Sequence, residues 1–118
     1  MSLEFLIVFP SVLLAVLVAL NAGLWFHARN IALSAAEEGV RVARTHAEPG
    51  DGVQAARRFA IESGDGILIQ PKATLGGNAD TVEITVTGEA VSLVPGLTLS
   101  ISQTARAPRE RFTVPGAP

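Results

Sequence analysis

The pattern of apolar and polar positions sets the first quarter of the chain apart from the rest. From Leu3 to Phe26 almost every residue is apolar, and the only charged residue in this run is Glu4. As a helix the run would reach about 36 Å, which is enough to cross a hydrocarbon core of about 30 Å. Its Leu, Ile, Val and Phe residues together favour insertion by roughly 7 kcal/mol, against about 3 kcal/mol for one badly placed charge. The pattern therefore predicts a membrane-spanning helix.

Helical spacing continues beyond the apolar run. No proline follows Phe26 until Pro49, and small residues recur at steps of three and four on one narrow face. Such a face lets another helix approach closely, so it predicts a helix-packing surface. The predicted packing residues are Gly23, Ala28, Ala32, Ala35, Gly39 and Ala43. We expect one long helix over residues 1–47, half in the membrane and half outside it, with a bend at Pro10.

A change to turn-forming residues and then to alternating patterns predicts a small module over residues 48–106. The segment Glu48 to Gly52 is expected to end the long helix, with Asp51 as a cap for a short helix that ends near Ser63. Apolar residues then alternate with polar ones in three segments, and this alternation is typical of half-buried strands. The segments are Ile67 to Leu75, Thr81 to Thr87 and Leu97 to Ser102. The predicted fold class is α+β: a long N-terminal transmembrane helix that continues out of the membrane, then a short helix packed on a small three-stranded antiparallel sheet.

Two segments of the module stand outside this pattern. The loop Ala90 to Gly96 is apolar, and its residues Leu93, Val94, Pro95 and Gly96 are predicted either to cap the sheet or to contact a partner. Residues 107–118 are rich in proline and are predicted to form a flexible tail.

Composition excludes several classes of function. The net charge is −2 and no cluster of Lys or Arg is present, so a nucleic-acid partner is not expected. The chain has no cysteine, which removes disulfides and thiolate metal sites. The only histidines, His27 and His46, would lie roughly 28 Å apart on one helix. Without a nucleophile motif or a phosphate-binding loop, we expect no enzymatic activity, no metal and no cofactor.

The apolar run has three interpretations. A cleaved secretory signal would use Ser34 and Ala36 as the small residues before the cleavage site, although the run is longer than a signal's apolar region. A plain anchor would place Trp25 at the interface, and the Arg residues that follow would then keep the carboxyl-terminal part in the cytoplasm. The third interpretation concerns Glu4, which either stays hydrated at the membrane surface or pairs with the amino terminus of a neighbouring copy.

The first residues also carry a resemblance. A glutamate opens the apolar run, a proline follows six residues later, a glycine stands near the end of the run, and Ala35-Ala36-Glu37-Glu38-Gly39-Val40-Arg41 follows. This arrangement resembles the TadE-like proteins of bacterial tight-adherence (Tad) pilus systems, over about Leu3 to Arg44. Glu4 corresponds to a glutamate that this family keeps near the mature amino terminus, although that residue is usually the fifth and here it is the fourth.

The resemblance implies a pseudopilin that assembles with other pilin-like or Tad subunits into a pilus or related secretion filament. Glu4 and Pro10 would then serve subunit pairing, and a prepilin peptidase would process a basic leader ahead of the mature chain. The protein would cross the bacterial cytoplasmic membrane once, with its carboxyl-terminal module extracytoplasmic. The alternative function is a membrane-tethered extracytoplasmic binding module that does not enter a filament.

Overall fold

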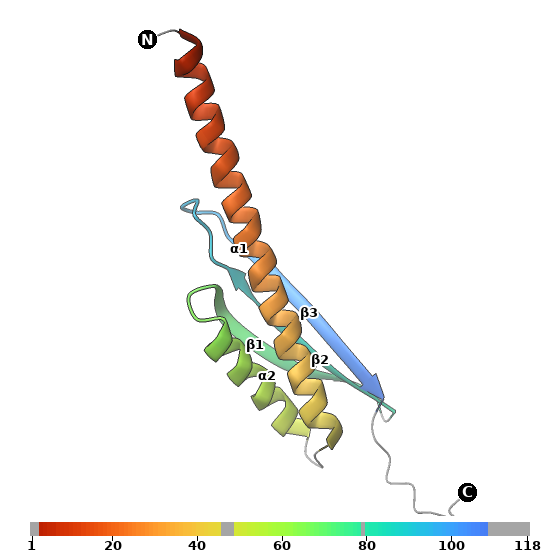
Figure 1. The fold of residues 1–118 in the computed structure, drawn as a ribbon. Coiled ribbons are helices and arrows are strands. Elements are labelled where there is room, and N and C mark those ends of the chain that lie inside the picture. Colours follow the sequence, from red (N-terminus) through yellow and green to blue (C-terminus); the bar gives the residue numbers. More distant parts are fainter. Residues whose placement is uncertain (1–2, 46–48, 79, 109–118) are drawn as a thin grey trace, which may run out of the picture.

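The structure, a computed structural model, describes residues 3–45, 49–78 and 80–108. Two helices, α1 (Leu3–Thr45) and α2 (Pro49–Ser63), are followed by three strands, β1 (Leu68–Gly77), β2 (Thr81–Ala90) and β3 (Leu99–Pro108). The molecule is 83 Å long and only 23 Å and 18 Å across, because the first half of α1 extends beyond every other element (Figure 1). The predicted α+β class is confirmed.

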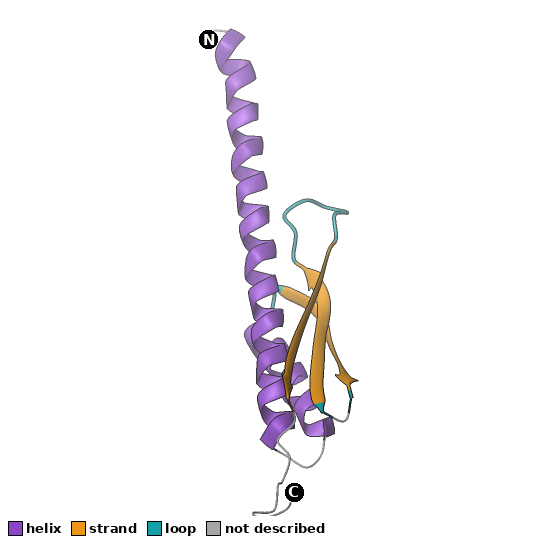
Figure 2. Cartoon of the chain, turned by 90° about the vertical axis from the view of Figure 1, so that its right-hand side faces the viewer, coloured by secondary structure: helices purple, strands orange, loops and turns teal. Residues whose placement is uncertain are grey.

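Helix α1 is continuous over its 43 residues. It passes through Pro10 without interruption, and the predicted continuation beyond the apolar run is confirmed (Figure 2). At about 1.5 Å per residue it is roughly 64 Å long, which is about twice the thickness of a hydrocarbon core. One half can therefore span a membrane while the other half belongs to the module.

Helix α2 begins earlier than the sequence predicted. Pro49 is its first residue, so Pro49 to Gly52 form the first helical turn rather than a break. Proline is well suited to this place because the first helical N–H needs no partner within the helix. Asp51 lies in the first turn, where its carboxylate meets the positive end of the helix dipole, and it does not precede the helix as a cap.

The three strands form one antiparallel sheet in the order β1-β2-β3. Strand β2 pairs with β3 without a register shift, from Thr81 opposite Pro108 to Ala90 opposite Leu99. Strand β1 has a register shift between Ile69 and Lys72, where Gln70 takes a positive φ of 51°. The shift includes Pro71, which lacks an N–H and is tolerated on an edge strand. This irregularity explains why β1 alternated less clearly in the sequence.

One face of the sheet carries the core. Val82, Ile84 and Val86 of β2 are at most 1% exposed, which confirms the dry side that their alternation predicted. Helix α1 packs over β2 and β3, while α2 packs mainly over β1 (Figure 1). On the opposite face the hydroxyl groups of Thr85 and Thr104 form a hydrogen bond with an oxygen–oxygen distance of 2.8 Å. On the same face the Arg106 Nε–H donates to the Glu83 Oε1 at 2.8 Å.

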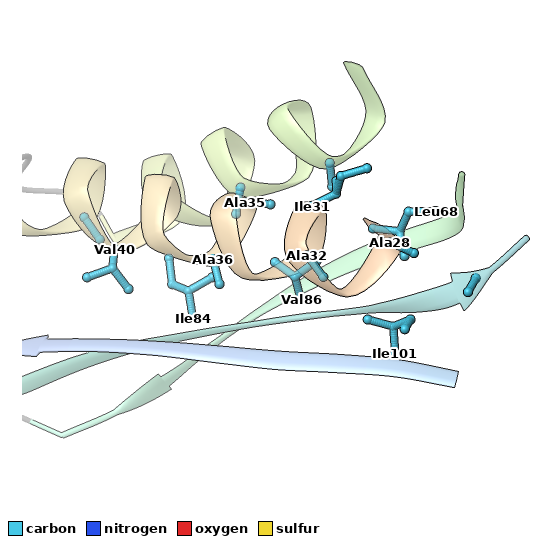
Figure 3. Close-up of a cluster of buried hydrophobic side chains, with 14 of the residues drawn as sticks. Ala28, Ile31, Ala32, Ala35, Ala36, Val40, Leu68, Ile84, Val86 and Ile101 are labelled. Atoms are coloured by element: carbon cyan, nitrogen blue, oxygen red, sulfur yellow. The ribbon is translucent and has the colours of Figure 1, made fainter. Parts of the chain in front are cut away.

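Helix α1 supplies much of this core. Its buried apolar residues face the sheet and α2 (Figure 3). They are Ala28, Ile31, Ala32, Ala35, Ala36, Val40 and Ala43. The second half of α1 is therefore part of the module's interior. Cleavage after Ala36 would remove five of these residues, so the fold argues against a secretory signal ending there.

The end of the module differs in detail from the prediction. Strand β3 begins at Leu99 rather than Leu97, because the N–H of Leu97 donates to the carbonyl of Val94 at 3.2 Å within the preceding turn. The strand continues to Pro108, so Ala107 and Pro108 are paired and not part of a tail. Residues 109–118 of the predicted tail lie outside the described residues.

Candidate functional site

The first half of α1 is an apolar rod with almost no cover from the rest of the chain. Its most hydrophobic 18-residue window is entirely unburied, and the helix is long and apolar enough to cross a membrane. The large apolar side chains from Leu3 to Leu20 are about half exposed or more, apart from Leu17, which is partly buried. In water such a surface would be far larger than the apolar patches that soluble monomers expose, so a bilayer or other helices must cover it.

Glu4 lies in the first turn of this rod and is exposed. Within the described part of the chain no cation lies within ion-pair distance of it. The next turn holds Phe5 and Phe9, whose rings stack with centroids 5.9 Å apart. Pro10 cannot donate a backbone hydrogen bond, and next to it the hydroxyl of Ser11 donates to the carbonyl of Ile7 at 2.8 Å. Glu4 is thus a carboxylate at the tip of an apolar surface, without an ion-pair partner among the described residues.

The predicted packing residues have a partner within the chain, which corrects their expected use between subunits. A Cβ on Gly39 would lie 2.7 Å from both the Ala56 Cβ and the Gly52 carbonyl oxygen, so α1 and α2 touch backbone to backbone. On α2 the small buried residues Gly52, Ala56 and Ala60 recur at steps of four, and the buried Gly64 follows directly after the helix. Because α2 and the sheet already cover the Ala28 to Ala43 face, it is not open to a neighbouring molecule.

Gly23 is the exception among the predicted packing residues. It is exposed, and a Cβ placed on it would meet nothing within 4 Å. Its predicted role in packing against another helix therefore stays a prediction, and the surface it belongs to is open.

Asn21 makes the contact that joins the apolar half of α1 to the module. Its side chain is 9% exposed, and its Oδ1 accepts hydrogen bonds from the Leu93 N–H at 3.0 Å and the Ser92 hydroxyl at 3.2 Å. The partner of Asn21 is therefore the loop between β2 and β3. The signal for this pairing, an amide within an apolar run, was visible, but its partner lies more than 70 residues away in the sequence.

The loop between β2 and β3, residues 91–98, is oriented along α1 toward the amino terminus (Figure 2). Leu93, Val94 and Leu97 are 46%, 37% and 42% exposed, so these side chains do not cover the sheet, and the alternative of contact with a partner stays a prediction. The loop and the helix instead form an apolar groove of about 450 Å³. The groove is lined by Leu14, Leu17, Val18, Asn21, Ala22, Trp25, Val94, Leu97 and Leu99.

Among the residues that the structure describes, titratable groups do not converge on any of these features. Among the described residues no group of three His, Asp or Glu side chains could hold a metal ion. The ion pairs of Arg41 with Glu38 and of Arg106 with Glu83 lie on the exposed surface of the module. What the arrangement offers is a surface for helix packing and lipid contact.

The structure thus defines a class of protein. In this class a helix that is long and apolar enough to span a membrane continues into a small α+β module. Residues 1–41 match the family model of TadE-like proteins, which confirms the resemblance seen in the sequence. The match covers the apolar half of α1 and most of its packed half, and it associates the chain with Tad pilus systems and the membrane. Comparisons with curated proteins and with solved structures gave no match.

Proposed function

We propose that this protein is a pilin-like structural subunit of a Tad-type pilus or related filament, and that it assembles through the first half of α1. The observation that carries the proposal is the division of α1 into two surfaces. The segment from Leu3 to Leu20 is bare, whereas the segment from Ala28 to Ala43 is fixed inside the module. A bare apolar helix on a rigid module can pass from lipid to a bundle of similar helices without refolding.

In this proposal Glu4 pairs with the amino terminus of an adjoining subunit. It lies at the exposed end of the rod and has no ion-pair partner among the described residues. A carboxylate in an apolar bundle is costly unless a cation compensates it, so an unpaired Glu4 would oppose assembly and a paired one would fix the register between subunits. Pro10 belongs to the same assembly segment.

The module would face the extracytoplasmic side and contact other components of the system. The role proposed is structural and not enzymatic, because the surfaces that the fold presents are suited to packing. They are the bare helix, an apolar loop and a sheet face whose polar side chains bind one another. The protein would first reside in the bacterial cytoplasmic membrane as a single-pass subunit and then enter the filament.

The experiment compares Glu4→Gln with Glu37→Gln in cells that assemble the filament. Both changes remove one exposed carboxylate from α1, but Glu37 lies on the module half. We expect Glu4→Gln to lower the amount of this chain in the sheared filament fraction at least several-fold, at an unchanged level in the membrane. We expect Glu37→Gln to leave both fractions unchanged.

Equal incorporation of the two variants would contradict the pairing role of Glu4. If this chain were absent from filaments made by the unaltered strain, the assembly proposal itself would fail. A membrane-tethered binding module would then be favoured, and substitutions at Leu93 and Val94 would be expected to abolish partner binding.

A further inference from the structure

We propose that the loop of residues 91–98 is a second membrane contact, which inserts beside α1 into the leaflet nearest the module, with lipid acyl chains filling the groove between loop and helix. The proposal goes beyond the assembly role, since it concerns the protein in the membrane before any filament forms. It holds for either orientation of the chain.

The depth of the loop along α1 is the first argument. Asn21, to which the loop is fastened, lies roughly 27 Å along the helix from Leu3, and a hydrocarbon core is about 30 Å thick. Trp25, about 33 Å from Leu3, then lies at the interface, where tryptophan is preferred. The groove extends from Trp25 to Leu14, so its wall reaches into the part of α1 that lipid would surround.

The composition of the loop is the second argument. From Ala90 to Leu99 the chain carries no charged residue, and Leu93, Val94 and Leu97 are exposed. Val94 and Leu97 line the groove together with residues from the apolar half of α1. Apart from Asn21, every residue that lines the groove is apolar. An occupant with charged or strongly hydrogen-bonding groups would find almost no partner there, whereas acyl chains need none.

The backbone of the loop is the third argument. Irregular backbone is tolerated at membrane depth only when its polar groups are satisfied within the protein. The N–H groups of Val91, Leu93, Val94 and Leu97 all donate hydrogen bonds within the chain, to Ile67, Asn21, Ser92 and Val94 respectively. Pro95 has no N–H to satisfy. Asn21 in turn is only 9% exposed, so its amide is largely shielded from lipid.

The test uses single cysteines in the full chain, which has no cysteine of its own. Leu93→Cys and Leu97→Cys place an environment-sensitive fluorophore on the loop. Leu75→Cys places it near the opposite end of the sheet, and Leu75 and Leu97 are both 42% exposed, so they form a matched pair. Each labelled protein is reconstituted at low density into phosphatidylethanolamine–phosphatidylglycerol vesicles that contain lipids with nitroxides on their acyl chains, and circular dichroism checks that the variants fold alike.

We expect the labels at positions 93 and 97 to be quenched by the nitroxide lipids and protected from aqueous iodide, and the label at position 75 to show the reverse. Loop labels that iodide quenches as fully as the label at position 75 would overturn the proposal. Protection that appears only as the protein-to-lipid ratio is raised would also overturn it, because a second copy's helix would then occupy the groove. Since the vesicles hold no other filament component, neither result depends on the assembly role.

Discussion

At the scale of single residues, Gly39 sets how closely the two helices approach. Its absent side chain allows α1 to rest on the Gly52 carbonyl oxygen and the Ala56 Cβ, and the Ile84 Cδ1 lies 2.9 Å from the place a Cβ would take. Two of these three neighbours are backbone or attached directly to it, so the contact cannot relax by turning a flexible side chain. The close packing of α1, α2 and β2 at this point therefore depends on the absence of a side chain at position 39.

We therefore predict that Gly39→Ala destabilises the module. Overpacking of this kind costs about 1–3 kcal/mol, against a gain of up to about 1 kcal/mol in helix propensity. Gly23→Ala is the matched control, because a Cβ on Gly23 would meet nothing within 4 Å and only the propensity gain applies. Thermal unfolding of the full chain in detergent micelles should show a lower midpoint for Gly39→Ala alone. Equal midpoints would mean that the helices are not in direct contact there.

Ile84 carries a second prediction at this scale. It is 0% exposed and among the largest fully buried side chains, and it lies between the sheet and the two helices. Ile84→Ala should lower the free energy of unfolding by about 2–5 kcal/mol, as expected for a cavity in a packed core. Leu75→Ala, at a site that is 42% exposed, should cost much less. Denaturant unfolding in micelles measures both, and similar losses would contradict the assigned core.

At the scale of elements, the contact between α1 and the β2–β3 loop rests on Asn21. Asn21→Ala would leave the Leu93 N–H and the Ser92 hydroxyl without their shared acceptor, a loss of about 1–3 kcal/mol for buried groups. We predict faster hydrogen exchange at Leu93 while exchange in β2 stays unchanged. Asn30→Ala, the same change at an exposed position of α1, should alter neither. Unaltered exchange at Leu93 would show that the loop is held by other contacts.

The elements also show what the sequence could and could not predict. Alternation in period two found β2 because Val82, Ile84 and Val86 face one dry layer, and hydropathy found the bare half of α1. The small-residue face of α1 was visible, but its partner was not, because close helix packing looks the same whether the second helix belongs to the same chain or to another. The Asn21–loop contact was hidden for a related reason: a polar residue in an apolar run shows that a partner is needed without saying which.

At the scale of the whole molecule, one continuous helix, α1, forms both the exposed apolar segment and part of the core of the module. Its second half belongs to the core of the module, so any force or displacement on the first half is transmitted directly to the sheet. No flexible linker separates the two halves, since the helix is continuous from Leu3 to Thr45. A subunit built in this way would hold its module at a fixed height and rotation relative to the apolar rod, as a regular filament requires.

The most direct test of this account is photo-cross-linking in assembled filaments. A photoreactive amino acid is placed at Leu13, which is 60% exposed on the bare half of α1, or at Leu75 on the module as a control. The account predicts that sheared filaments contain this chain cross-linked through position 13 to another filament subunit, with far less product through position 75. Filaments that contain the chain but show no cross-link through position 13 would contradict assembly by the bare half of α1.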